Sequence, residues 1–172
     1  VDSDNRFTRS LSYLENWDYL YIPTSTAATI FDQFFMTLSK NLLQDEIGED
    51  AYQALIRMEH LPVMITTRML KENSTFFDDR NTAETESRDD IFRISMEETL
   101  AQLSETYGTE TLDWRWENVH QLTLRPPLLG EISDNPDSPD VFKTIVNNLF
   151  NKGPYPVQGH GMSINKSRYS WH

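Results

Sequence analysis

Several residues of this chain could do chemistry, and we first ask whether their spacing fits a metal site. The four histidines stand at His60, His120, His160 and His172. No two of them have the i, i+4 spacing that places two imidazoles on one helix face, and the chain contains no cysteine to complete a zinc site. We therefore expect surface or packing histidines and no metal ligand among them.

Acidic residues offer two further possibilities. The loop Asp134–Asp140 carries oxygen ligands of the kind that calcium prefers, but it lacks the glycine turn and closing glutamate of an EF-hand. A solvated turn is the better interpretation, with calcium as the alternative. Adjacent acids on a helix point apart, so the acidic pairs predict a solvated face and no shared acid–base site. These pairs are Asp45-Glu46, Glu49-Asp50, Asp78-Asp79, Asp89-Asp90 and Glu97-Glu98.

A nucleophilic enzyme needs a nucleophile beside a base and an orienting group. The sequence has no Gly-x-Ser-x-Gly elbow and no cysteine. An N-terminal nucleophile would have to be Ser, Thr or Cys at the first position, where this chain has Val1. The residues by themselves therefore indicate no active site, and we assign no catalytic, cofactor-binding or metal-binding residue.

Composition limits the class of protein. The 172 residues include 15 Lys and Arg against 27 Asp and Glu, a formal net charge of −12, with 38% hydrophobic and 12% aromatic residues. This is too apolar for a disordered chain and too acidic for nucleic-acid binding. No apolar run approaches the roughly 18 residues of a membrane span, and no leader opens the chain. We expect no nucleic-acid partner and no membrane span.

Hydrophobic spacing predicts helices in the first part of the chain. Apolar residues recur every three or four positions, and Gly48 and Gly108 are suitable helix ends. The predicted helices cover about Thr24–Glu46, Glu49–His60, Pro62–Lys71 and Glu86–Tyr107, and the opening Val1–Asn5 is predicted to be loose.

The period becomes strand-like after Gly108. Val119–Leu124 is a predicted strand, Asp140–Leu149 a short helix, and Pro156–Trp171 one or two strands broken at glycines. The charge changes at the same place: residues 1–108 hold 20 acids and 9 bases, and residues 109–172 hold 7 and 6. We therefore predict an α+β fold with a helical subdomain in 1–108, whose helices run over about 24–108, and a strand-rich segment in 109–172.

Three segments carry a resemblance to a known family. Trp114-Arg115-Trp116-Glu117-Asn118-Val119-His120, followed by Leu124–Leu128, resembles the Trp-Arg-Trp-Gly-x-x-His segment and the following Pro-Leu of the penicillin amidase (penicillin acylase) family. Leu149–Asn165 is similar to its Leu-Phe…Gly-Pro-x-Pro-Val-Gly-Gly-Asp…Thr-Val-Asn stretch, and Leu14–Asp18 to its Leu-x-x-Trp-Asp segment. Order and spacing agree along most of the chain. The departures from the family pattern are Glu117 for Gly, Gln158 for Gly, His160 for Asp and Ser163 for Thr.

The resemblance implies an N-terminal nucleophile (Ntn) hydrolase that processes itself into two chains and folds as an αββα sandwich. In that family the nucleophile is the serine that opens the β chain, and both it and the oxyanion hole lie upstream of the matched segments. The chain then resembles a late piece of a β chain. Ser3, Ser10 and His120 match no catalytic position, and Trp114 and Trp116 read as packing anchors at the helix-to-sheet junction.

Two functions follow as expectations. The first is a fragment of an amidase that cleaves a β-lactam side chain or an N-acylated amine, inactive alone, with the remaining α- and β-chain segments and a small-molecule amide as partners. No cofactor is expected in this chain, although the resemblance allows calcium in the parent enzyme, which the family places in the periplasm or outside the cell. The second is a free-standing acidic helical binding or scaffolding module without catalysis.

Overall fold

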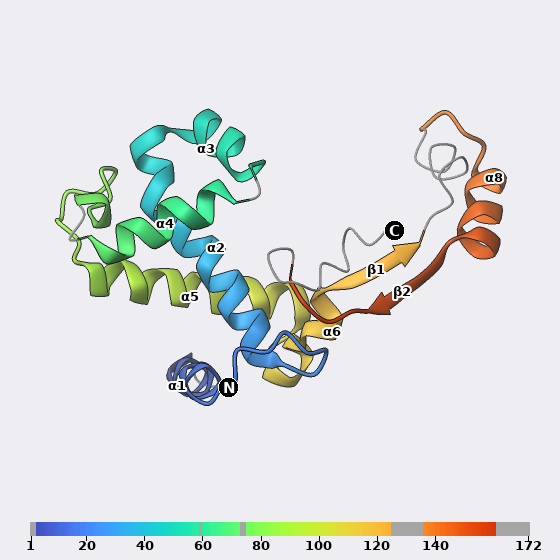
Figure 1. The fold of residues 1–172 in the computed structure, drawn as a ribbon, viewed down its shortest axis with the longest axis horizontal. Coiled ribbons are helices and arrows are strands. Elements are labelled where there is room, and N and C mark those ends of the chain that lie inside the picture. The colour runs from blue at the N-terminus through green and yellow to red at the C-terminus, as the bar shows by residue number, and fades with distance from the viewer. Residues whose placement is uncertain (1–2, 59, 73–74, 125–135, 161–172) are drawn as a thin grey trace. The chain divides into compact units, whose positions relative to one another are not determined.

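The computed structural model describes residues 3–58, 60–72, 75–124 and 136–160. The chain divides into two compact units (Figure 1). Val1–Tyr19 and Thr26–Arg115 form the first unit, and Leu20–Ser25 joins Trp116–His172 in the second. The division into a helical subdomain, residues 1–108, and a strand-rich segment, residues 109–172, stays a prediction.

The first unit is helical. Its elements are α1 (Ser3–Glu15), α2 (Thr26–Ile47), α3 (Glu49–Ile56), α4 (Leu61–Lys71) and α5 (Arg88–Tyr107), with short 3₁₀ turns η1 (Thr75–Phe77) and η2 (Thr111–Trp114). The four helices predicted from hydrophobic spacing are confirmed. The predicted second helix is too long, because the chain turns after Ile56 so that Pro62 can occupy the first turn of α4, where its missing N–H costs nothing.

Helix α2 forms the centre of this unit. Ile30 packs in a cluster with Leu100 and Trp114 from α5 and η2, and Leu38 and Leu42 pack in a second cluster with residues of α3, η1 and α5. In Figure 1, α5 crosses α2, and α3 and α4 follow at the far end of α2. Burial along one helix thus holds together segments from residue 7 to residue 114.

The predicted loose start is wrong for the described residues, because α1 begins at Ser3. The segment is polar overall, but Phe7, Tyr13 and Leu14 recur on one side and pack against the Ile30 cluster. Most helical stability in proteins comes from such packing of an apolar face. The composition of the first five residues did not reveal that face.

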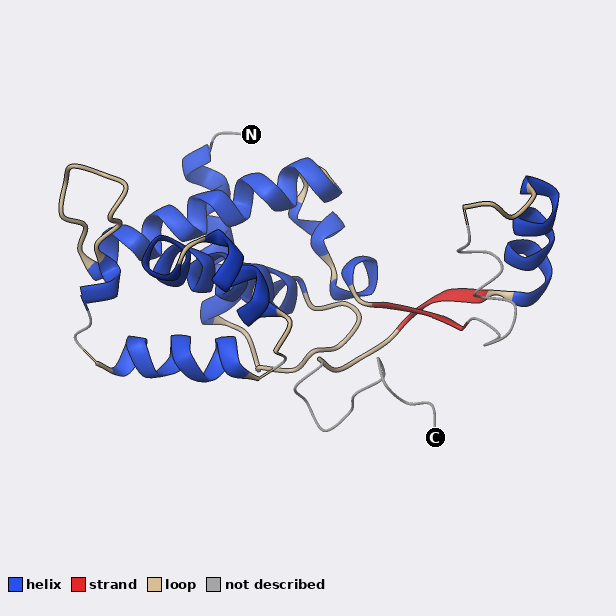
Figure 2. Ribbon diagram, turned by 90° about the horizontal axis from the view of Figure 1, so that it is seen from above, coloured by secondary structure: helices blue, strands red, loops and turns tan. Residues whose placement is uncertain are grey.

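The second unit contains a short antiparallel ribbon. The helical turn α6 (Trp116–Val119) precedes β1 (Gln121–Leu124), and α8 (Asp140–Ile145) with the π-helical η3 (Val146–Phe150) precedes β2 (Lys152–Pro156). Leu122 lies opposite Tyr155, and Leu124 opposite Lys152, with an irregularity between these pairs. The two strands are drawn in red in Figure 2, and α8 leads into the second of them.

The predicted last strands are displaced in the structure. Instead of beginning at Pro156, the strand ends there, and residues 157–160 are not in a strand. Gly153 explains the position, because its φ is +121° and a Cβ atom added there would lie only 2.6 Å from the Leu122 carbonyl oxygen. The amides of Val157 and Gly159 bond to carbonyls outside the ribbon. The rest of the prediction, from 161 to 171, lies outside the described residues.

Mostly helical structure with a small antiparallel sheet confirms the α+β class. The short helix predicted from Asp140 is also confirmed. Membership of these two strands in an αββα sandwich stays a proposal.

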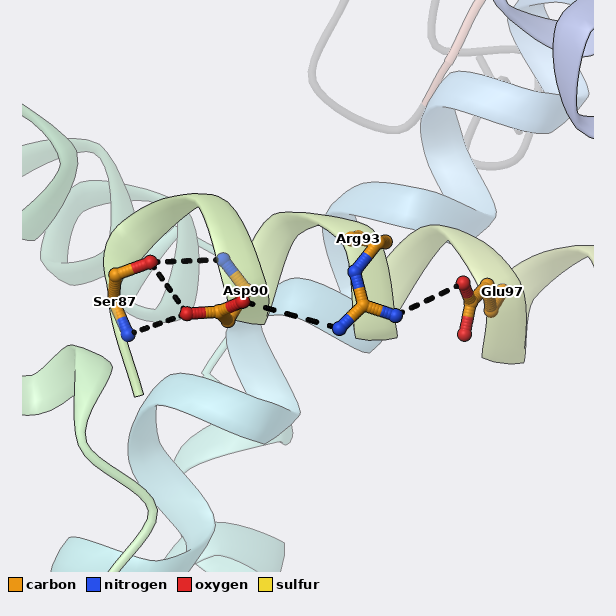
Figure 3. Close-up of polar contacts among 4 residues, drawn as sticks. All are labelled: Ser87, Asp90, Arg93 and Glu97. Carbon is orange, nitrogen blue, oxygen red and sulfur yellow. Dashed lines mark hydrogen bonds and ion pairs between the residues drawn. The ribbon is translucent and has the colours of Figure 1, made fainter. Parts of the chain in front are cut away.

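The first turn of α5 is fixed by a reciprocal capping box (Figure 3). The Ser87 hydroxyl accepts from the Asp90 amide at 3.3 Å, and the Asp90 carboxylate accepts from the Ser87 amide at 3.0 Å. One turn further on, Arg93 pairs with Asp90 and Glu97 on the exposed side of the helix. The cap satisfies amides that a helix start otherwise leaves unpaired.

We predict that Ser87→Ala lowers the free energy of unfolding by about 1 kcal/mol, the usual cost of losing an N-cap. Thr85→Ala is the matched control, because Thr85 is exposed and lies just before the cap. Urea denaturation of the two variants and the parent chain measures the difference. Equal destabilisation by both variants would contradict the assignment of Ser87 as the cap.

The same cap predicts a pH dependence. Hydrogen bonds from the Ser87 side chain and backbone, helped by Arg93, lower the pKa of Asp90. Because the lowered pKa belongs to the folded state, the stability it contributes is present above the unfolded carboxyl pKa of about 3.9 and is lost as the pH falls through the folded pKa. The stability advantage of the parent chain over Asp90→Asn should therefore shrink below about pH 4. The measurement is urea denaturation of both proteins at a series of pH values. A difference in their free energies of unfolding that stays constant as the pH falls would contradict the prediction.

Candidate functional site

The second unit has an aromatic cluster centred on Trp116. The rings of Tyr21 and His120 each lie 5.0 Å from the Trp116 ring, and His160 lies 5.1 Å from Tyr21 and 6.3 Å from Trp116. Trp116 itself is only 2% exposed. We call these four residues the Trp116 cluster. It brings together segments that are separated by almost 140 positions in the sequence.

Hydrogen bonds to the backbone fix the cluster. The indole Nε1–H of Trp116 donates to the Gly159 carbonyl at 3.0 Å, and the Gly159 amide donates to the Tyr21 carbonyl at 2.8 Å. The Val157 amide donates to the His120 carbonyl at 3.2 Å, and the Trp116 amide donates to the Ser25 carbonyl at 3.1 Å. A buried indole normally finds such a partner, since an unpaired N–H is costly away from water.

These contacts join two of the segments that carry the family resemblance. Trp116 and His120 belong to the Trp-Arg-Trp segment, and Gly159 and His160 belong to the later Gly-rich segment. The sequence could therefore indicate that these four residues matter. It could not indicate Tyr21, because no spacing rule links position 21 to positions 116 and 160.

The chemistry of the cluster is that of packing and orientation. The Nδ1 atom of His120 lies 3.3 Å from the Val157 carbonyl oxygen, which suits the tautomer that carries a proton on Nδ1. Ring contacts and backbone bonds of this kind fix the path of the chain and hold imidazoles in one orientation. The predicted role of Trp116 as a packing anchor is confirmed, as is that of Trp114, which is fully buried and donates to the Gly108 carbonyl at 2.8 Å.

The other sequence candidates lie apart from this cluster. His60 stands at the N-terminal boundary of α4, and His172 lies outside the described residues. Ser10 is fully buried in the first unit, where its hydroxyl has no hydrogen-bond partner among the described residues, and Ser3 begins α1. Within the described ranges, no three His, Asp or Glu side chains gather in a way that could hold a metal ion.

The loop that could supply calcium ligands is described only from residue 136 onward. The Lys143 ammonium donates to the Pro136 carbonyl at 3.1 Å, and Asp140 begins α8. Asp134 and Asn135 lie outside the described residues. The choice between a solvated turn and a calcium loop therefore stays a prediction.

The structure does bring several of the acidic pairs together, which their sequence spacing did not indicate. A cleft of about 510 Å³ in the first unit is lined by Asp45, Glu49, Asp79 and Glu98, with Lys40 beside them. Two of the carboxylates at this cleft accept backbone N–H groups of the connector before α5: Asp45 accepts from Arg80, and Glu86 accepts from Asp79, each at 3.0 Å. These acids therefore order the loop that precedes α5.

The model of the penicillin amidase family matches residues 2–172. An acyl-homoserine lactone acylase of Pseudomonas putida is 27% identical over 134 residues, covering 73% of this chain. Acylases of the same name from Pseudomonas aeruginosa and Pseudomonas fluorescens are 21% and 23% identical, each over 86% of the chain.

The chain spans 16% to 18% of the length of these curated relatives. No solved structure matches. None of the helices described is both long enough and apolar enough to cross a membrane.

The Trp116 cluster predicts a measurable cost for a small change. Trp116→Phe keeps an aromatic ring but leaves the Gly159 carbonyl without its donor, which should destabilise the protein by about 1 to 3 kcal/mol. Tyr155→Phe, on the exposed face of β2, is the control and should change stability little. Hydrogen exchange localises the effect: in Trp116→Phe the Gly159 amide should exchange faster, while amides of α2 keep their protection. Unchanged exchange at Gly159 would show that the bond does not hold the cluster.

Proposed function

Because the chain belongs to the penicillin amidase family, we propose that it is a structural part of an amidase whose catalytic nucleophile lies outside residues 1–172. The reaction adds water across a non-peptide amide, releasing a carboxylic acid and an amine. The observation that carries the proposal is the family match over nearly the whole chain. It is supported by the meeting of two family-like segments at Trp116.

The role proposed for this chain follows from its contacts. Trp116 and Gly159 are held by backbone bonds and ring packing, which is how a scaffold keeps distant segments in register. A triad or oxyanion hole needs a nucleophile near a base, with donors aimed at the developing charge. We assign that chemistry to an N-terminal serine on another segment of the same enzyme, as the family resemblance implies.

For the substrate, we favour an N-acyl-homoserine lactone over a β-lactam with an acylated side chain. The three relatives from Pseudomonas are all named acyl-homoserine lactone acylases. Both substrates present the same scissile group, a secondary amide between an acyl chain and an amine on a strained or small ring.

The test uses the complete polypeptide that carries residues 1–172. We expect it to release free homoserine lactone and the fatty acid from an N-acyl-homoserine lactone, measured by mass spectrometry, whereas the purified 1–172 chain releases neither. Ser10→Ala in the complete polypeptide is the control and should keep full turnover, because Ser10 is buried in the helical unit and matches no catalytic position of the family.

Two results would contradict the proposal. Turnover by the purified 1–172 chain would show that a nucleophile lies inside it. Failure of the correctly processed complete polypeptide to cleave any N-acyl lactone, acyl anilide or β-lactam amide would remove the amidase assignment.

The alternative, a free-standing binding module, has one observation in its favour. The first unit contains its own core around α2, so a stable helical body is physically reasonable. A free-standing module requires the whole of 1–172 to be monomeric and to unfold cooperatively, including the ribbon. Analytical ultracentrifugation with urea denaturation separates this from the aggregation that exposed ribbon edges promote.

A further inference from the structure

The helical stretch α8–η3 exposes an unusual number of large apolar side chains. Val141 and Leu149 are each 63% exposed and Phe142 is 54% exposed. Ile145 and Phe150 are also exposed, at 43% and 46%. We call these five residues the α8 face.

Their spacing makes the stretch amphipathic. Val141, Phe142, Ile145 and Leu149 follow one another at intervals of one, three and four, which places them along one side of a helix. Asp140, Lys143 and Asn147, at intervals of three and four, fall on the opposite, polar side. Single exposed apolar residues are ordinary on a protein surface, but a contiguous set on one helix marks a surface that another element covers.

We propose that the α8 face is a docking surface for a further segment of the same polypeptide, packed on it in the assembled amidase. The inference rests on the proposed function, because it takes the chain to be part of a larger enzyme. The share of the relatives' length that this chain spans, 16% to 18%, leaves ample polypeptide to supply the occupant.

The adjoining ribbon points to the same occupant. β1 and β2 form a two-stranded sheet, and every residue of β2 is exposed. Isolated two-stranded ribbons are marginal in water, and they become stable when further strands or a packed layer cover one face. Leu124 and Tyr155 are exposed apolar residues on this ribbon, so the ribbon and the α8 face need the same kind of partner.

The chemistry of the α8 face defines that partner. The five side chains offer no charge and no hydrogen-bonding group, so the occupant must present an apolar surface without unpaired charges. The two charged residues of α8, Asp140 and Lys143, lie on its polar side, and Lys143 donates to the Pro136 carbonyl. An apolar sheet or helix face of the same enzyme fits this description, and a polar peptide or an anionic ligand does not.

The absence of cysteine from residues 1–172 allows a direct test in the complete polypeptide. Val141→Cys and Leu149→Cys place a thiol on the α8 face, and Asp140→Cys and Asn147→Cys place one at exposed positions on the polar side of the same stretch. Labelling with a maleimide, read by peptide mass mapping, gives the rate at each position. We expect the face positions to react at least about tenfold more slowly than the polar positions, because a packed layer must open first. All four should react alike in denaturant.

Equal rates at all four positions in the native polypeptide would overturn the docking proposal. Protection that disappears on dilution to nanomolar concentration would overturn it as well, because the occupant would then be a second copy of the chain. Turnover of N-acyl-homoserine lactone by the same four variants separates the two proposals. A fully labelled α8 face in an active enzyme rejects the docking surface and leaves the amidase intact. A protected face in an inactive polypeptide supports the docking surface and counts against the amidase.

Discussion

Burial of α2 is the constraint on which the first unit depends. Ile30 near one end and Leu38 and Leu42 further along are fully buried, and each anchors a different cluster. Because one continuous helix passes through both clusters, it positions the elements packed on its two halves relative to one another. Truncating a buried leucine or isoleucine to alanine typically costs about 2 to 5 kcal/mol, so Ile30 and these two leucines are costly to change.

Small polar side chains form hydrogen bonds between α2 and the helices that pack on it. Ser39 on α2 accepts a hydrogen bond from Thr66 on α4 at 2.9 Å, and Asn41 donates to Ser95 on α5 at 3.1 Å. Thr99 bonds back to the Ser95 carbonyl within α5. Buried hydroxyl groups are tolerated where they find such partners, so small polar residues fill places that an apolar pattern alone would not predict. The charged pairs on the outside, by contrast, are exposed and contribute little to stability.

Much of this architecture could be predicted from the sequence, and the physical reason differs between the two units. Long helices such as α2 and α5 repeat an apolar position every turn, and glycines with positive φ at positions 48 and 108 end them. Helix α1 was not predicted, because its few apolar residues form a recognisable face only where they pack against the Ile30 cluster. The position of β2 depends on Gly153 and on the partner strand, which a local pattern cannot reveal. At the candidate site, Trp116 and Gly159 belong to segments that resemble the family, so the sequence indicated them. Tyr21 could not be predicted, because it meets Trp116 only in the folded chain.

The second unit is held mainly by directional bonds. Among its described residues, Trp116 and Val146 are the large apolar side chains that are buried, whereas the first unit buries most of the core. Hydrogen bonds from Trp116, Val157 and Gly159 define the path of the chain there, but each such bond contributes only about 0.5 to 1.5 kcal/mol net. A ribbon fixed in conformation but poor in buried area gains most of its stability when another layer covers it. The two units therefore differ in how they are stabilised: the helical unit has a core of its own, and the ribbon still has apolar surface to bury.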